Sequence, residues 1–176
     1  MNGFSIAVLL ALSVATTEAN LSKQQLYEAI NTTGRIWTVQ RTFELTGPKG
    51  KHTCVNAFQK HLHGDSYQFQ QHYKEGDKRK MEPLYGKLAD GARGPVLTVS
   101  KEEGNGGIPY TLLYWDVNRH CGILEFVDQK RVRQCELHVW EEDLLNSRST
   151  PCDHEYDTYC GDPKYEVYKS NCLTDP

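Results

Sequence analysis

The sequence lacks the features that would indicate an enzyme or a nucleic-acid-binding protein. Its formal net charge is only −3 and no basic cluster falls on a periodic segment, so it offers no long-range field for nucleic acid. No GxSxG motif marks a hydrolase nucleophile, and no cysteines have the CxxC spacing of zinc or thioredoxin-like sites. We therefore expect no catalytic residues, no cofactor and no nucleic-acid partner.

The histidines give little support for a metal site. His61 and His63 share one face of an extended run, an arrangement that some zinc sites use. No third ligand follows at a recognisable spacing, and the pair stands just before Gly64, as is typical of a solvated hairpin end. We predict no bound metal.

Long apolar runs are also scarce. The one such run, residues 6–15, is too short to span a bilayer and is followed by small residues ending at Ala19. This order is typical of a secretory signal peptide, although no Lys or Arg precedes the run. We predict a signal peptide over residues 1–19 and a secreted mature domain over residues 20–176, with no membrane span.

In a secreted protein, the cysteines are expected to form disulfides. An even number in an oxidising compartment predicts three disulfides, whose pairing the residues alone leave open. The six are Cys54, Cys121, Cys135, Cys152, Cys160 and Cys172. Two glycosylation sequons begin at Asn20 and Asn31, and the second stands at the end of a predicted helix over residues 21–30.

The remaining chain reads as one β-rich domain without repeats or linkers. Eight predicted strands span residues 36–45, 52–59, 66–73, 80–88, 95–101, 108–117, 121–127 and 132–140. The last three carry apolar residues on both faces, which requires a core on one side and a cavity or a packed helix on the other. A turn into a helix follows over residues 141–146, and a short strand over residues 165–168. The pattern predicts an all-β fold with flanking helices, built on an antiparallel barrel with a ligand cavity.

Two of these strands bear on a pocket. In residues 108–117, strict alternation places Tyr110 and Tyr114 on one face and Trp115 on the other. In residues 36–45, Trp37 shares an apolar face that Arg41 interrupts, which indicates either a buried ionic partner or an irregular register.

Six residues form the predicted ligand site: Trp37, Tyr110, Tyr114, Trp115, Glu136 and His138. The four aromatic residues are either ordinary core or pocket walls, and their faces suit an amine by cation–π contact or a sterol or lipid by apolar area. Glu136 lies within an apolar strand on the same face as His138. It is either exposed or turned inward toward a cationic or hydrogen-bonding ligand, because an unpartnered buried carboxylate is costly.

Short motifs, in this order and spacing, resemble the tick salivary lipocalins, the family of the histamine-binding proteins. They are Trp37 with Arg41-Thr42-Phe43, Thr53-Cys54-Val55, Tyr114-Trp115-Asp116, Cys121-Gly122-Ile123-Leu124, Cys135-Glu136-Leu137-His138-Val139-Trp140, and the late Cys152 and Cys172. The resemblance covers essentially the mature chain. It implies an eight-stranded antiparallel lipocalin barrel, with an N-terminal helix, a C-terminal helix packed outside, and an internal ligand cavity.

The resemblance also implies a disulfide pairing. It joins Cys54 to Cys172 and Cys121 to Cys152, and the two cysteines that remain give the third predicted pair, Cys135–Cys160.

The family captures host mediators: histamine or serotonin, leukotrienes and other lipids, or cholesterol, and some members bind a complement component. Glu136 matches the inward glutamate of the amine binders, and Trp37 matches a first-strand aromatic residue that is often Tyr. Gly122, however, stands where those relatives carry an acidic residue, so an ammonium group would be poorly neutralised.

We therefore predict a secreted monomer that binds a sterol or lipid such as cholesterol and modulates host immune cells, such as dendritic cells, at the feeding site. The alternative ligand is a biogenic amine, histamine or serotonin, held by Glu136. A rival function of another class is a protein–protein modulator whose outer loops engage an immune-cell or complement target.

Overall fold

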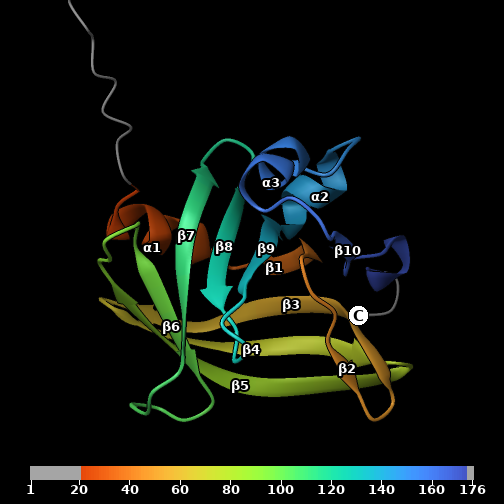
Figure 1. Cartoon of the computed structure of the whole chain (residues 1–176), viewed down its shortest axis with the longest axis horizontal. Helices are drawn as coiled ribbons and strands as arrows, with labels where there is room; N and C mark the ends of the chain where they lie inside the picture. The colour runs from red at the N-terminus through yellow and green to blue at the C-terminus, as the bar shows by residue number, and fades with distance from the viewer. Residues whose placement is uncertain (1–20, 174–176) are drawn as a thin grey trace, which may run out of the picture.

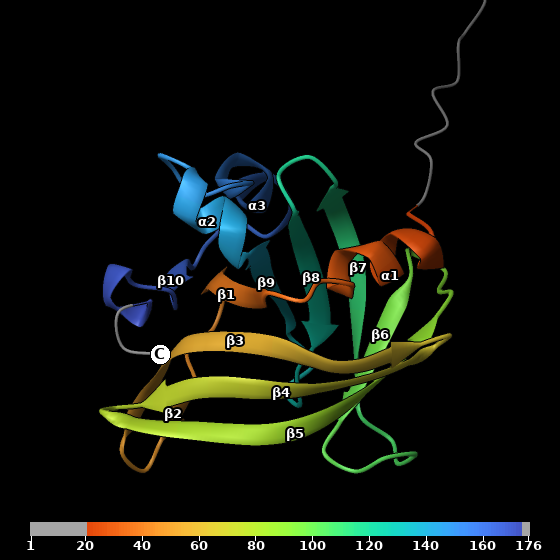
Figure 2. The ribbon, with the colours of Figure 1, turned by 180° about the vertical axis from the view of Figure 1, so that it is seen from behind.

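A closed barrel of eight antiparallel strands forms the body of the computed structural model, which describes residues 21–173 (Figures 1 and 2). The barrel strands are β1 (Arg35–Arg41), β3 (Gly50–His63), β4 (Ser66–Glu75), β5 (Lys78–Ala89), β6 (Val96–Ser100), β7 (Ile108–Asp116), β8 (Cys121–Val127) and β9 (Arg133–Trp140). Strand β1 pairs with β9 on one side and β3 on the other, which closes the barrel. The predicted fold class is confirmed. The predicted signal peptide and the sequon at Asn20 lie outside the described residues.

Two of the barrel's β-bulges, those in β1 and β7, decide which of the predicted site residues face the interior. One lies in β1 between Thr38 and Gln40, so that Thr38 opposes His138 while Arg41 opposes Glu136. Because residues directly opposite each other in an antiparallel ladder share a face, Arg41 is brought to the inner side of the wall. The predicted strand over residues 36–45 therefore ends early and has the irregular register that Arg41 suggested.

The second bulge lies in β7 between Leu112 and Tyr114. The extra residue reverses the alternation from that point, since side chains otherwise switch faces at every residue. Tyr110 and Trp115 both end up facing the interior, although strict alternation predicted opposite faces for them.

The N-terminal helix α1 (Lys23–Ile30) covers one end of the barrel (Figure 2). Ser22 and Gln25 form a capping box at its start, which satisfies backbone N–H groups that would otherwise lack acceptors. Its apolar face buries Leu26 and Ile30, and the Trp140 indole Nε1 donates to the Ala29 carbonyl at 2.9 Å. The helix is thereby held as a plug over the cavity.

The C-terminal segment packs on the outer wall of β1 and β7–β9 (Figure 1). It contains the helices α2 (Glu141–Asn146) and α3 (Asp153–Tyr159), the short strand β10 (Tyr165–Glu166), and a 3₁₀ turn, η1 (Ser170–Cys172). The ring of Tyr156 is fully buried between α3 and the wall. A two-residue strand, β2 (Thr46–Gly47), extends the sheet beside β3.

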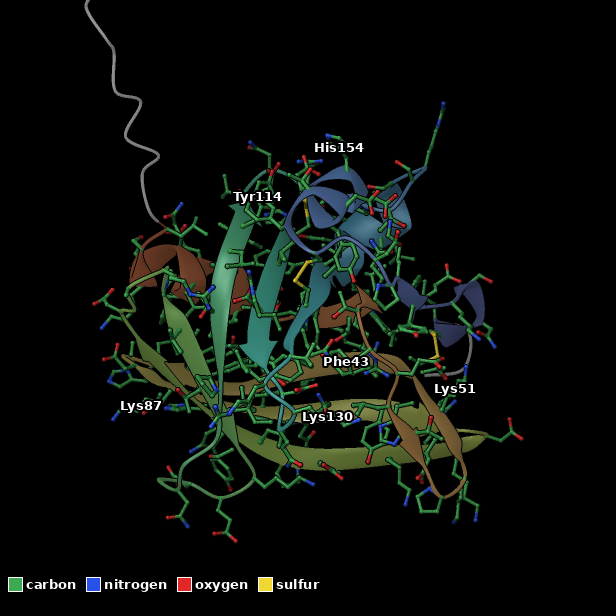
Figure 3. The ribbon with its side chains drawn as sticks, viewed as in Figure 1. Phe43, Lys51, Lys87, Tyr114, Lys130 and His154 are labelled. Atoms are coloured by element: carbon green, nitrogen blue, oxygen red, sulfur yellow. A yellow bond between two sulfur atoms is a disulfide. The ribbon has the colours of Figure 1, made fainter. Side chains whose placement is uncertain are left out.

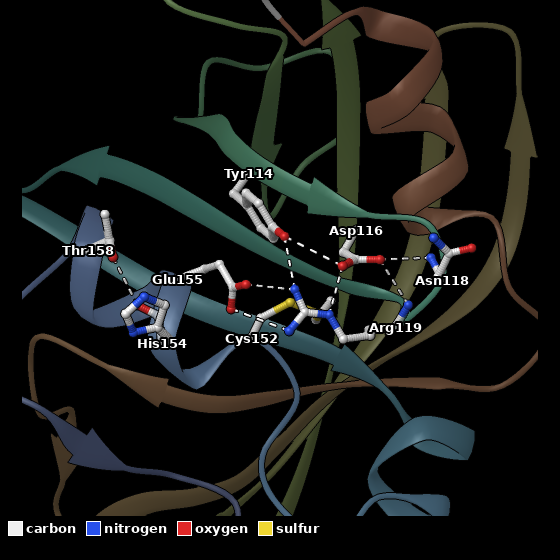
Figure 4. Close-up of polar contacts among 9 residues, drawn as sticks. Tyr114, Asp116, Asn118, Arg119, Cys152, His154, Glu155 and Thr158 are labelled. Carbon is white, nitrogen blue, oxygen red and sulfur yellow. Dashed lines mark hydrogen bonds and ion pairs between the residues drawn. A yellow bond between two sulfur atoms is a disulfide. The ribbon is translucent and has the colours of Figure 1, made fainter.

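Three disulfides fasten this segment to the barrel: Cys54–Cys172, Cys121–Cys152 and Cys135–Cys160. The first two are the pairs that the family resemblance implies, and the third joins the two cysteines that remained. A polar cluster adds a fourth attachment, because Arg119, in the β7–β8 turn, donates to both Asp116 and Glu155 at 2.7 Å (Figure 4). The C-terminal helix thus lies outside the barrel, and the interior is left to other side chains.

Candidate functional site

The barrel encloses a cavity of about 400 Å³. The half beneath α1 is apolar, and its wall includes Leu26, Ile30, Tyr67, Phe69, Trp115 and Trp140. The rings of Tyr67 and Phe69 stack with centroids 4.7 Å apart, and those of Trp115 and Trp140 lie 6.0 Å apart. This half offers a broad, rigid aromatic surface to a ligand.

Two hydrogen-bond donors in the apolar half have no partner among the described residues. They are the Tyr67 hydroxyl and the Trp115 indole Nε1. Tyr67 is only 2% exposed, and burial raises the pKa of its hydroxyl, which stays neutral and able to donate. Since an unpaired buried donor is costly, both groups fit a ligand that carries a hydrogen-bond acceptor.

The other half of the cavity is polar and is organised around Glu136. Its carboxylate lies 3.0 Å from His138 Nε2. Arg41, opposite Glu136 across the β1–β9 ladder, is only 3% exposed and donates from Nη2 to the His52 carbonyl at 3.2 Å. Burial lowers the pKa of Arg41, and the negative charge of Glu136 partly offsets that effect. The carboxylate therefore already faces a cation and a hydrogen-bond partner.

A second carboxylate, Glu82, lines the same polar half. The Tyr73 hydroxyl donates to it at 3.0 Å, and Lys101 Nζ lies 3.3 Å away. The Tyr73 ring stacks on His52 with centroids 4.5 Å apart. Both carboxylates of the cavity wall are thus engaged by groups of the protein itself.

Four of the six predicted site residues line the cavity: Tyr110, Trp115, Glu136 and His138. The prediction missed Tyr67, Tyr73, His52 and Glu82. For Tyr67 and Tyr73 a signal was present, because the predicted strand over residues 66–73 places both on one apolar face. Glu82 and His52 gave no comparable signal, since a polar residue in an alternating strand is normally expected to face solvent.

Trp37 and Tyr114 require correction, because both lie on the outer wall. The Trp37 indole Nε1 donates to Glu141 at 2.9 Å, and its ring meets the ring of Tyr168 edge-on. The Tyr114 hydroxyl accepts from Arg119 at 3.0 Å (Figure 4). Trp37 alternates with the inward Ile36 and Thr38, and the β7 bulge turns Tyr114 outward.

The groups that could hold a metal ion are few. His61 and His63 are exposed in the part of the chain that the structure describes, with ring centroids 6.2 Å apart. His120, Glu142 and Asp143 place ligand-type atoms within 4.8 Å of one another. His120 Nδ1 is already 2.9 Å from Asp143, and its ring stacks on Trp140 at 4.1 Å. This cluster serves to fix a wall of the cavity.

An eight-stranded barrel around a largely apolar cavity, with one end plugged by a helix, defines a ligand-binding protein of the lipocalin type. The family model described as tick histamine binding protein matches residues 14–174, and the chain belongs to that family.

Solved structures share the fold. One is the AM182–serotonin complex, 17% identical with a TM-score of 0.59, covering 84% of this chain and 91% of that one. Another is Japanin from Rhipicephalus appendiculatus bound to cholesterol, 15% identical with a TM-score of 0.56, covering 80% of this chain and 96% of that one. No curated protein matches the sequence. Among residues 21–173, no helix is long and apolar enough to cross a membrane.

Proposed function

We propose that this protein is secreted and captures one small, largely apolar molecule of the sterol or lipid class in its barrel. The observation that carries the proposal is the pairing of both cavity carboxylates. Glu136 is engaged by His138 and faces Arg41, and Glu82 is engaged by Tyr73 and Lys101. An ammonium ligand would have to displace these partners before it gained a counter-charge of its own.

The apolar half of the cavity supports the same ligand class. A Cβ added at Gly122 would lie only 3.3 Å from Trp115 Cε3, so the indole occupies the space beside the position where amine-binding relatives carry an acidic side chain. Burying apolar ligand surface contributes about 25 cal/mol per Å² before the costs of association. The unpartnered donors of Tyr67 and Trp115 suit a neutral hydroxyl or carbonyl oxygen on such a ligand.

The alternative ligand is a biogenic amine bound at Glu136. Its support is that Glu136 lines the cavity, that the family takes its name from histamine binding, and that a protein of the same fold is known as a serotonin complex. The rings of Tyr110 and Trp115 in the wall could contact a cation.

Calorimetry with cholesterol, histamine and serotonin on the wild type and on Glu136→Gln separates the two ligand classes. For a sterol site, Glu136→Gln costs at most one hydrogen bond, about 1 kcal/mol. For an amine site, the substitution removes the counter-charge and abolishes binding. Tight amine binding that vanishes in the variant would replace the sterol proposal by the alternative. Native mass spectrometry of protein secreted from eukaryotic cells would identify a co-purified ligand.

The biological role that fits this binding is modulation of host immune cells, such as dendritic cells, at a feeding site. Secretion is supported by the apolar N-terminal run and by three disulfides, which persist in oxidising compartments. We expect a monomer that acts by withholding or delivering its ligand. Dendritic cells exposed to ligand-loaded and ligand-free protein would test the role, and equal responses to the two forms would indicate that the outer surface acts instead.

A further inference from the structure

Two basic turns lie against each other at one end of the barrel. They are the β2–β3 turn, with Lys49 and Lys51, and the β4–β5 turn, with Lys78 and Lys80 (Figure 1, at the β2 end of β3–β5). The Gly76 N–H donates to the Lys51 carbonyl at 3.3 Å, which links the two turns through their backbones.

Glycine makes this close approach possible. A Cβ on Gly76 would lie 2.2 Å from the Lys49 carbonyl oxygen, and Gly76 has a φ of +60°. Both conditions exclude a side chain at this position. The backbone therefore holds the lysines of one turn beside those of the other.

Positive charge is in excess here, although the whole chain is acidic. Residues 44–51 and 74–80 contain six cations and three anions, a net charge of +3, whereas the full chain carries −3. Lys51 is paired with Glu44, and Lys80 Nζ lies 3.9 Å from Glu75. The nearby Lys78 and Lys80 lower the pKa of Lys49, which shows that like charges crowd this exposed edge.

The positive surface continues onto the outer wall as a cleft of about 50 Å³. Its basic lining residues are Arg35, His72, Lys74, Arg79 and Lys80. The Nε2 atom of His72 is buried without a partner among residues 21–173, and the pKa of His72 is lowered by burial and by the charges of Arg35 and Lys60. Lys74 and Arg79 have contacts of their own and still add to the field. The cleft is of a size for a single anionic group.

We propose that these two turns and the adjoining cleft bind a sulfated polysaccharide of the glycosaminoglycan type. The cations lie on two surfaces that meet at an edge, the tips of the turns and the outer wall of β3–β5. A flexible linear polyanion can follow such an edge, whereas a flat anionic bilayer would touch only one of the two surfaces. Sulfate groups keep their negative charge at any physiological pH, so the attraction is lasting and is screened by salt.

The experiment compares Lys49→Glu/Lys78→Glu with a control of equal charge change, Lys87→Glu/Lys130→Glu. Figure 3 shows Lys87 and Lys130 away from Lys51 and its turn. Lys78 and Lys87 lie near opposite ends of β5, roughly 30 Å apart by strand geometry. All four lysines are exposed, so both variants are expected to fold and to keep the cholesterol affinity of the wild type.

Each protein is titrated onto immobilised heparin, onto desulfated heparin, and onto phosphatidylserine vesicles. We expect the wild type to bind heparin at physiological salt and the turn variant to bind on the order of tenfold more weakly, with no loss in the control. A Lys49→Gln/Lys78→Gln variant gives an intermediate loss, and desulfation weakens wild-type binding.

Three outcomes would overturn the proposal: no heparin binding by the wild type, equal losses in the turn variant and the control, or preference for the vesicles over heparin. None of these outcomes bears on the proposed cavity ligand, because cholesterol binding is measured in a separate titration without heparin.

Discussion

Arg41 and Glu136 lie directly opposite each other across the β1–β9 ladder; Arg41 is buried in the barrel wall, and Glu136 lines the polar end of the cavity. The pairing depends on the β1 bulge, which changes the register between Thr38 and Gln40. The charge of the buried Arg41 guanidinium offsets that of the partly buried Glu136 carboxylate, which leaves this end of the cavity close to neutral. Its neutrality is the main reason to expect an uncharged ligand.

Arg41→Met should destabilise the protein by about 1–3 kcal/mol, because the hydrogen bond from the guanidinium to the His52 carbonyl and its attraction for Glu136 are both lost. Urea denaturation gives the measurement. The double variant Arg41→Met/Glu136→Gln should recover part of the loss, since it leaves neither charge behind. If the single and double variants were equally unstable, the two residues would not be coupled.

Tyr67→Phe should lower the affinity for the ligand without lowering the stability of the empty barrel. The Tyr67 hydroxyl has no partner in the described protein, so its removal should leave the empty barrel as stable as before, or more stable by about 1 kcal/mol. A ligand that uses the hydroxyl should bind about 1 kcal/mol more weakly. Thermal denaturation and calorimetry check the two effects. Tyr27→Phe is the matched control, since Tyr27 does not line the cavity; loss of affinity in both variants would contradict the prediction.

Non-reducing peptide mapping should recover the three links Cys54–Cys172, Cys121–Cys152 and Cys135–Cys160. Replacing Cys135 and Cys160 together by serine should cost about 2–4 kcal/mol, because the bridge that restricts the unfolded chain is lost. Linkage of Cys54 to Cys121 would be incompatible with the structure. The urea midpoint of the double serine variant provides the stability measurement.

The attachment of α3 should weaken in acid. The Arg119 hydrogen bond lowers the pKa of Glu155, and hydrogen bonds from Gln40 and Lys164 lower the pKa of Asp153. Because these pKa values are lower in the folded than in the unfolded protein, the stabilisation is complete above the unfolded values near about 4 and is lost as the pH falls through the folded values. Each group is partly exposed, so the contribution is less than about 1 kcal/mol.

Arg119→Gln provides the test of this acid effect. Its urea midpoint should lie below that of the wild type at neutral pH, and the difference should shrink as Glu155 becomes protonated. A difference that stayed constant between neutral and strongly acidic solution would show that Arg119 acts by packing alone.

Asn31 should carry a glycan. It is exposed directly after the last turn of α1, in the sequon Asn31-Thr32-Thr33. Glycosidase treatment of protein from eukaryotic cells should lower its mass, and Asn31→Gln should remove the effect. A mass that glycosidase leaves unchanged would rule the glycan out.

Short-range patterns along the chain were enough to predict the elements of the fold and one wall of the site. Period-two alternation revealed all eight barrel strands, and the helical spacing with Ser22 revealed α1, because both signals depend on neighbours close along the chain. Glu136 and His138 were found together since both lie on one regular strand without a bulge.

Which aromatic residues face the cavity, and where positive charge collects, depends on contacts between segments that are far apart in the sequence. The bulges in β1 and β7 are consequences of pairing with neighbouring strands, so alternation misplaced Tyr114 and left Arg41 ambiguous. The basic edge likewise arises when two turns meet, Lys49 in one and Lys78 in the other, nearly thirty residues apart in sequence. The local sequence of a strand or turn does not specify which distant segment it will contact, and such residues come together only when the sheet closes.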